Sequence, residues 1–223
     1  MKVKIAILIF LIAIVFSCPA AYGATEEIIA GMGHKLVRGC TNVLTGWLEI
    51  PMQIIKGYKR SGDEIDGKLL GAAAGFFEGI GCTIGRTAWG VVEVAGFWAA
   101  NPKDNIDIGM PLETEYAWQE EDTMYGSLVG AEDKGIGPIS KKFLRGLGNS
   151  LFGFAEFPGQ IAKGIENKSC DLGITRGIWF WYSREFYGIA DLVTFIFPNP
   201  DDNPGYAFDE EYPWDALVYV IEK

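Results

Sequence analysis

Glu49 and Glu156 are the residues of this sequence best placed to do chemistry. Each lies in a segment that occurs twice, and each is followed by one apolar residue and a proline. Two carboxylates can share general acid and base work, and the repeated Arg86 and Arg184 could bind an anionic group beside them. One hypothesis is therefore an enzyme that acts on glycan or peptide through these four residues, in the cell envelope if the chain is exported.

The surrounding residues favour a structural role for the two glutamates. No nucleophile accompanies either glutamate in the sequence, and His34 is the single histidine of the chain. One histidine near the start of the mature chain is a poor general base for a duplicated enzyme. We therefore predict that the glutamates form structural ion pairs, that no residue is catalytic, and that the protein is not an enzyme.

The sequence gives little support for a metal or cofactor site. Acidic residues follow each half of the chain without the D-x-D-x-D-G spacing of a calcium loop: Asp104, Asp107, Glu113, Glu115, Asp201, Asp202, Asp209 and Glu210. Cys40, Cys82 and Cys170 form no C-x-x-C motif, so zinc and haem are not indicated. We expect no metal and no cofactor. The disulfide state of these three cysteines stays open, although Leu147 at the position of Cys40 favours a buried thiol.

The elements that must position these residues are repeated. Residues 35–57, K-L-V-R-G-C-T-N-V-L-T-G-W-L-E-I-P-M-Q-I-I-K-G, return at 142–164 as K-F-L-R-G-L-G-N-S-L-F-G-F-A-E-F-P-G-Q-I-A-K-G, with 12 of 23 positions identical. The chain is therefore interpreted as a tandem duplication.

Each repeated segment is predicted to form one helix with a polar side and an apolar side. The polar side is unchanged between the copies: Lys35, Arg38, Asn42, Glu49, Gln53 and Lys56 return as Lys142, Arg145, Asn149, Glu156, Gln160 and Lys163. The apolar side drifts, and in the first copy it holds Leu36, Cys40, Val43, Trp47, Ile50 and Ile54. A solvated polar face should drift faster than a packed one. We interpret the retained polar face as one that touches something specific, with a solvated charged face as the alternative.

A second helix is predicted in each copy, over 67–100 and 172–197. A stripe of small residues marks its inner side: Gly67, Gly71, Gly75 and Gly79 in the first copy, Gly173 and Gly177 in the second. Interior glycines weaken a helix, so such a stripe indicates that another backbone packs closely there. Proline-rich, acidic and extended tails follow both helices.

The order of charges along the helices predicts how each hairpin pairs. Both helices of a copy run basic then acidic, so an antiparallel hairpin sets Arg38 against Glu93 and Glu49 against Arg86. The second copy gives Arg145 with Asp191 and Glu156 with Arg184. We expect the Glu49–Arg86 and Glu156–Arg184 pairs to be the more buried ones, and the apolar sides of the helices to form a shared core.

Residues 1–23 have the features of a signal peptide. Lys2 and Lys4 precede an apolar run over 5–16, and Ala21-Tyr22-Gly23 supplies small residues at the cleavage positions. Cleavage there is the favoured interpretation, and a lipoprotein anchored through Cys18 is the alternative. Either outcome predicts an exported protein of the periplasm or outer cell envelope. Charges interrupt both second helices, which favours a peripheral or unanchored mature chain over a membrane-spanning one.

The charge of the chain excludes one class of partner. Its formal net charge is −10, and no basic patch is present that could neutralise phosphates. Nucleic acid is therefore a poor partner. An envelope protein or a membrane surface remains as the expected partner, and the oligomeric state is not determined by the sequence.

The motif R-G-x-x-N-x-x-x-G-x-x-E-x-P occurs at 38–51 and again at 145–158, and the second copy ends in T-F-I-F-P-N-P at 194–200. These blocks resemble the exosortase system-associated family of small exported bacterial proteins. The first copy departs from it at 96–102, which reads G-F-W-A-A-N-P. The resemblance implies an association with exosortase and exopolysaccharide systems and implies no activity and no catalytic residues.

Together these observations predict a mainly α protein in which two tandem helical hairpins pack as one bundle, each followed by an extended acidic tail. The expected organisation is a signal peptide over 1–23, a first repeat over 24–118, a linker over 119–139 and a second repeat over 140–223. The expected function is that of a non-catalytic scaffold or adaptor of the cell envelope.

Overall fold

The protein is mainly α-helical, as predicted. The computed structural model describes residues 22–62, 64–102, 105, 108–112, 114–119, 136–167, 170–203, 206–209 and 212–215. All but the last two residues of the predicted signal peptide, with Cys18, lie outside this part of the chain, as does most of the predicted linker. Helix α5 begins at Ile136, inside the predicted linker, with Pro138 in its first turn, where a missing N–H costs nothing.

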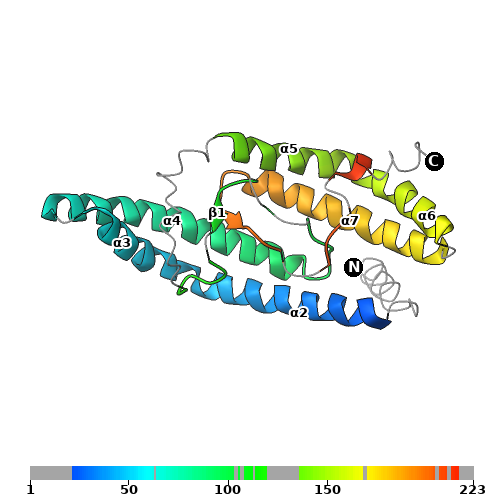
Figure 1. Cartoon of the computed structure of the whole chain (residues 1–223), viewed down its shortest axis with the longest axis horizontal. Helices are drawn as coiled ribbons and strands as arrows, with labels where there is room; N and C mark the ends of the chain where they lie inside the picture. The colour runs from blue at the N-terminus through cyan, green and yellow to red at the C-terminus, as the bar shows by residue number, and fades with distance from the viewer. Residues whose placement is uncertain are drawn as a thin grey trace, which may run out of the picture.

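Each copy folds as a helical hairpin whose first leg is interrupted (Figure 1). In the first copy the legs are α2 (Tyr22–Thr45), η2 (Gly46–Leu48) and α3 (Glu49–Arg60), followed by α4 (Ile65–Ala95). In the second they are α5 (Ile136–Phe152), η3 (Gly153–Ala155) and α6 (Glu156–Glu166), followed by α7 (Cys170–Thr194).

The prediction of one continuous helix in each repeated segment, over 35–57 and 142–164, is wrong in one respect. A 3₁₀ turn separates α2 from α3 and α5 from α6. Pro51 and Pro158 are the third residues of α3 and α6. A proline has no N–H to continue an α-helical ladder but is tolerated in a first turn, so each leg restarts just before its proline.

The tails join the two copies. Strand β1 (Pro111–Leu112) of the first tail pairs in parallel with β2 (Asn199–Pro200) of the second. Asn101 forms a further parallel bridge with Ala207. Figure 1 shows these segments crossing between the hairpins. The two tails are therefore joined to each other through backbone pairing, and this links the two copies.

The two hairpins also meet through aromatic side chains of α4 and α7. Trp89, Ala99 and Tyr187 form one buried cluster. Ala100, Phe180 and Phe208 form a second. These two small clusters form the apolar core that the copies share.

The prediction that the apolar sides of the helices face the core is wrong for the first legs, and for α4 as well, where Leu69, Phe77 and Val91 are 64%, 71% and 54% exposed. Lys35, Arg38 and Asn42 are buried, whereas the apolar residues opposite them are exposed, Leu36 by 39% and Trp47 by 60%. Leu44 and Leu151, in equivalent positions, are 73% and 57% exposed. The hairpins are thus packed with their polar faces inside. Among the described residues, no helix has both the length and the apolar character needed to cross a membrane.

Candidate functional site: a buried polar network

The eight charged residues predicted to pair meet inside the hairpins in the predicted combinations. Arg38 binds Glu93, and Glu49 lies 2.5 Å from Arg86. In the second copy the shortest distances are 2.8 Å for Arg145–Asp191 and 2.5 Å for Glu156–Arg184. All eight side chains are at most 4% exposed. Ion pairs so deep in a protein are held by geometry and by further hydrogen bonds.

The expectation that Glu49–Arg86 and Glu156–Arg184 are the more buried pairs is wrong in the first copy and holds in the second. Glu49 and Arg86 are 4% and 2% exposed, against 2% and 1% for Glu93 and Arg38. Glu156 and Arg184 are both 0% exposed, against 2% and 0% for Arg145 and Asp191. All four pairs therefore lie at nearly the same depth, and Arg38 also donates from Nη1 to Asp202 Oδ1 of the second tail at 3.2 Å.

Both oxygens of each candidate catalytic carboxylate are occupied. Glu49 Oε1 accepts from Arg86 Nε at 2.6 Å, and its Oε2 accepts from Gln53 at 3.1 Å. Glu156 repeats this with Arg184 at 2.6 Å and Gln160 at 3.3 Å. A carboxylate with its lone pairs committed to a buried guanidinium and an amide cannot readily exchange a proton with a substrate.

Glycines bring the backbones of each hairpin into contact. A Cβ on Gly75 would lie 2.1 Å from the carbonyl oxygen of Gln53, and one on Gly79 would lie 2.7 Å from Ile50 Cα. In the second copy a Cβ on Gly173 would lie 2.6 Å from Gln160 O. The remaining members of the predicted stripe are also close to other chain segments: Gly67 to Ser61, Gly71 to Gly57 and Ser61, and Gly177 to Phe157. No side chain separates the two backbones there.

The backbones of each hairpin also meet at a second crossing point. A Cβ on Gly39 would lie 2.8 Å from the Gly90 carbonyl oxygen, and one on Gly146 would lie 2.9 Å from that of Gly188. These glycines lie on the same sides of their helices as the arginines. Their retention in both copies was the available signal.

Lys35 and Lys142 close the open ends of the second helices. Lys35 Nζ donates to Gly96 O at 2.7 Å and Ala99 O at 2.8 Å, just beyond the last residue of α4. Lys142 Nζ donates to the carbonyl of Thr194, the last residue of α7, at 2.9 Å and to Phe197 O beyond it at 3.1 Å. Carbonyls at a helix C-terminus lack helical partners and carry partial negative charge, so a cation there satisfies both needs.

These lysines are buried deeply enough to lose basicity. Burial lowers the pKa of Lys35 to about 7, although the Glu93 carboxylate favours its charged form. Burial likewise lowers the pKa of Lys142 to about 8, against the influence of Asp191. Both lysines were recognised in the sequence as part of the retained polar face, but their roles were not.

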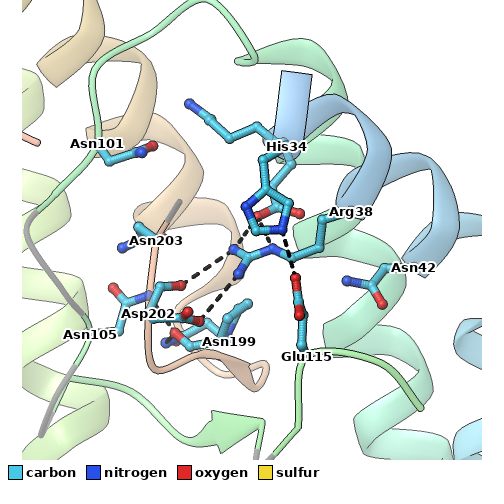
Figure 2. A network of polar contacts seen from close by, with 12 residues as sticks. His34, Arg38, Asn42, Asn101, Asn105, Glu115, Asn199, Asp202 and Asn203 are labelled. Carbon is cyan, nitrogen blue, oxygen red and sulfur yellow. Dashed lines mark hydrogen bonds and ion pairs between the residues drawn. The ribbon is translucent and has the colours of Figure 1, made fainter. Parts of the chain in front are cut away.

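The tails complete the network from the opposite copy. Asn105 of the first tail accepts a hydrogen bond from Arg145 Nη2 at 2.7 Å. Figure 2 shows Arg38 of the first copy reaching towards Asp202 of the second tail. The repeated N-P-x-D-N motif at 101–105 and 199–203 was the sequence signal for these contacts.

The first tail also covers its own hairpin. Arg86 Nη1 donates to Thr114 O at 2.9 Å and Glu115 O at 2.7 Å. Each tail ends in stacked rings, Tyr116 on Trp118 and Tyr212 on Trp214. In the second tail, Asp209 lies 2.5 Å from Arg176 and 3.4 Å from Lys163 of its own hairpin.

The described residues contain no group of three histidine, cysteine, aspartate or glutamate side chains placed to hold a metal ion. Cys40 is exposed and Cys82 is buried. The side chain of Cys170 lies outside the described part of the structure. Comparisons with known proteins found no matching family model, no similar curated protein and no similar solved structure.

Proposed function

We propose that this protein is a non-catalytic scaffold or adaptor of the cell envelope, exported and associated with exosortase and exopolysaccharide systems. One observation carries the non-catalytic part: the polar side chains that could do chemistry bind each other inside the hairpins. Glu49 and Glu156 are 3% and 0% exposed, and a substrate could not reach them without opening a hairpin. The association with exosortase systems rests on the family resemblance alone.

The outer faces of the first legs supply the contact surface for this function. We use "outer faces" for the exposed apolar residues that α2–η2 and α5–η3 present in equivalent positions: Val37, Leu44 and Trp47, and Leu144, Leu151 and Phe154. They are between 53% and 73% exposed. A monomeric soluble protein rarely exposes large apolar areas, so such faces mark interaction sites. Two equivalent faces suit a repeated contact, with an envelope protein as the favoured partner and a membrane surface as the second candidate.

Photo-crosslinking from the outer faces tests this proposal. A photoreactive amino acid is placed at Leu44 or Leu151 in the native host, and at exposed Gln119 as the control position. We expect both outer-face positions to crosslink the same envelope protein and the control position to give no such product. Crosslinks at the control that match those at Leu44 and Leu151 would contradict the proposal.

The enzyme hypothesis makes an opposite prediction about Glu49→Gln with Glu156→Gln. An enzyme would keep its fold and lose a glycan- or peptide-cleaving activity. A scaffold held by these pairs loses stability instead. Thermal unfolding followed by circular dichroism, with product analysis on the same samples, separates the two outcomes.

A further inference from the structure

One part of the apolar surface belongs to the first copy only. We call α3 together with residues 65–79 of α4 the arm, and Figure 1 shows it projecting beyond the rest of the molecule. Its outward side chains are more exposed than most: Ile55 47%, Tyr58 48%, Ile65 75%, Leu69 64%, Leu70 74%, Phe76 42% and Phe77 71%. Since glycines bring the two backbones together, the arm has no apolar interior in which these side chains could be buried.

Comparison of the two copies shows that the outer side of the arm is more apolar than its sequence equivalent. The glycines of the arm's inner side are kept in the second copy, with Gly75 and Gly79 returning as Gly173 and Gly177. Among the outward positions, Leu70, Ala73 and Phe77 correspond in the sequence to Lys168, Asp171 and Thr175, whereas Phe76 corresponds to the apolar Ile174. The exposed apolar surface of the arm is therefore larger than the retained glycine packing by itself requires.

The chemistry of the arm points to lipid more than to protein. From Leu69 to Phe77 the sequence is L-L-G-A-A-A-G-F-F, which offers no side-chain hydrogen-bond donor or acceptor. From Leu69 to Ala95, about 40 Å of helix, the charged residues are Glu78, Arg86 and Glu93, and all three are buried. Protein interfaces carry about one hydrogen bond per 100–200 Å² and a polar rim. The acyl layer of a bilayer accepts a surface with neither.

The end of the arm has the side chains of a membrane–water boundary. Tyr58 is half exposed, with Lys68 Nζ 5.5 Å from its ring centre. Lys59 and Arg60 occupy the last turn of α3 beside it. Tyrosine and long basic side chains concentrate where headgroups meet acyl chains, because their apolar parts enter the membrane while their polar ends stay in water. Basic side chains beside an apolar helix face are typical of helices that lie along a bilayer surface.

We propose that the arm docks on a phospholipid bilayer, with the outer side of α4 from Ile65 to Phe77 immersed at the boundary of the headgroups and acyl chains. This names the partner of one surface of the scaffold and rests on the proposed function. Helices in this position immerse their apolar faces by about 5–10 Å. Burial of apolar area drives the contact, so salt should have little effect on it.

Site-specific fluorescence on the full chain tests the docking. An environment-sensitive fluorescent amino acid replaces Leu70, or Ile174 as an exposed apolar control position of the second copy, and phosphatidylcholine vesicles with brominated acyl chains are added. We expect a blue shift and bromine quenching at Leu70 and neither at Ile174, unchanged between 0.15 M and about 1 M NaCl. The apolar run at 5–16 is present in both proteins and cannot produce a difference between these positions. Equal signals at both positions, or a signal lost in high salt, would overturn the proposal.

A pair of variants tests the same surface by binding. Leu70→Glu with Phe77→Glu should lower co-flotation with phosphatidylcholine vesicles at least about tenfold, because charges are costly at that depth. Ile165→Glu with Ile174→Glu, exposed positions of the second copy, should leave it unchanged. Circular dichroism checks that all the variants have the same helix content as the wild type. If a glutamate variant has lost helix content, the corresponding serine variant is used in its place.

The lipid proposal would be overturned by two results together: the wild-type protein is a dimer that does not bind vesicles, and the double substitution Leu70→Glu with Phe77→Glu dissociates that dimer. The arm would then be a self-association surface. The crosslinks from Leu44 and Leu151 are read separately from the arm. Their presence without vesicle binding would remove this inference and leave the scaffold function standing.

Discussion

Lys35 of the first copy lies over the ring of Tyr187 of the second, with its Nζ 5.1 Å from the ring centre. The relationship is reciprocal, since Lys142 lies 5.4 Å from the ring of Trp89. Each lysine also binds the carbonyls that end the second helix of its own hairpin. A single buried ammonium group thus links both legs of one copy to the other copy, and cation–π contacts of this kind strengthen when they are desolvated.

The lysines make stability depend on pH. Burial lowers the pKa of Lys35 from 10.5 to about 7 in the folded protein. Between these values the unfolded chain binds a proton that the folded chain lacks, so the free energy of unfolding should rise as pH increases from about 7. The contribution of each lysine has a slope of at most about 1.4 kcal/mol per pH unit. Lys142, with a pKa of about 8, adds its contribution above pH 8.

Lys35→Met is the matched variant for this measurement. Urea unfolding at pH 6.5, 8 and 9.5 gives the difference in stability between wild type and variant, which cancels the titration of other groups. We expect that difference to shift in favour of wild type as the pH rises. The series stops below pH 10 because burial raises the pKa of Tyr187, so the ionising tyrosine of the unfolded chain would then lower stability. A constant difference would show that Lys35 keeps an ordinary pKa.

The Glu156–Arg184 pair is expected to be strongly coupled. Both side chains are 0% exposed, and removing one partner leaves the other charge buried. Glu156→Gln or Arg184→Met alone should cost about 3–5 kcal/mol, and the double variant should cost clearly less than the sum. Chemical denaturation of the four proteins of the cycle measures this. A coupling energy near zero would mean that the pair does not hold the hairpin.

Gly75→Ala should destabilise the first hairpin, because the new Cβ would lie 2.1 Å from Gln53 O and the backbones would have to separate. The expected cost is about 1–3 kcal/mol or more. Gly33→Ala is the control, since a Cβ there meets nothing within 4 Å. That change should stabilise α2 by about 0.5–1 kcal/mol. Thermal melts with the same sign for both variants would contradict the packing described here.

The tails should differ in how much their cross-copy contacts contribute. Asn105 is 1% exposed and accepts from Arg145, so Asn105→Ala should cost about 1–3 kcal/mol by leaving a buried donor unpaired. Asp202 binds Arg38 with a side chain that is 84% exposed, so Asp202→Ala should cost at most about 1 kcal/mol. Urea unfolding curves give both values. If Asp202→Ala cost more stability than Asn105→Ala, the Asp202–Arg38 contact would be the more important of the two, contrary to this prediction.

The sequence by itself determined the helical class and the pairing of the charged residues. The helical class follows from local periodicity, and the pairing follows from the order of charges along two antiparallel helices. The similar segment over 142–164, with the helix that follows it, predicts the same pairing. Gly75 and Gly173 likewise predicted a close approach of two backbones, because glycine destabilises a helix interior and is retained there mainly where another backbone packs closely.

Only the tertiary structure decided which face of each helix points inward. An amphipathic pattern distinguishes the side of Arg38 from the side of Leu36 but not inside from outside, and the usual assumption placed the apolar side in the core. In the structure the backbones are in contact at the glycines, and the guanidinium and carboxylate groups of the ion pairs occupy the space between these contacts. The tails were equally beyond local patterns, since Asn105 meets Arg145 through a contact between the two copies that no single repeat contains.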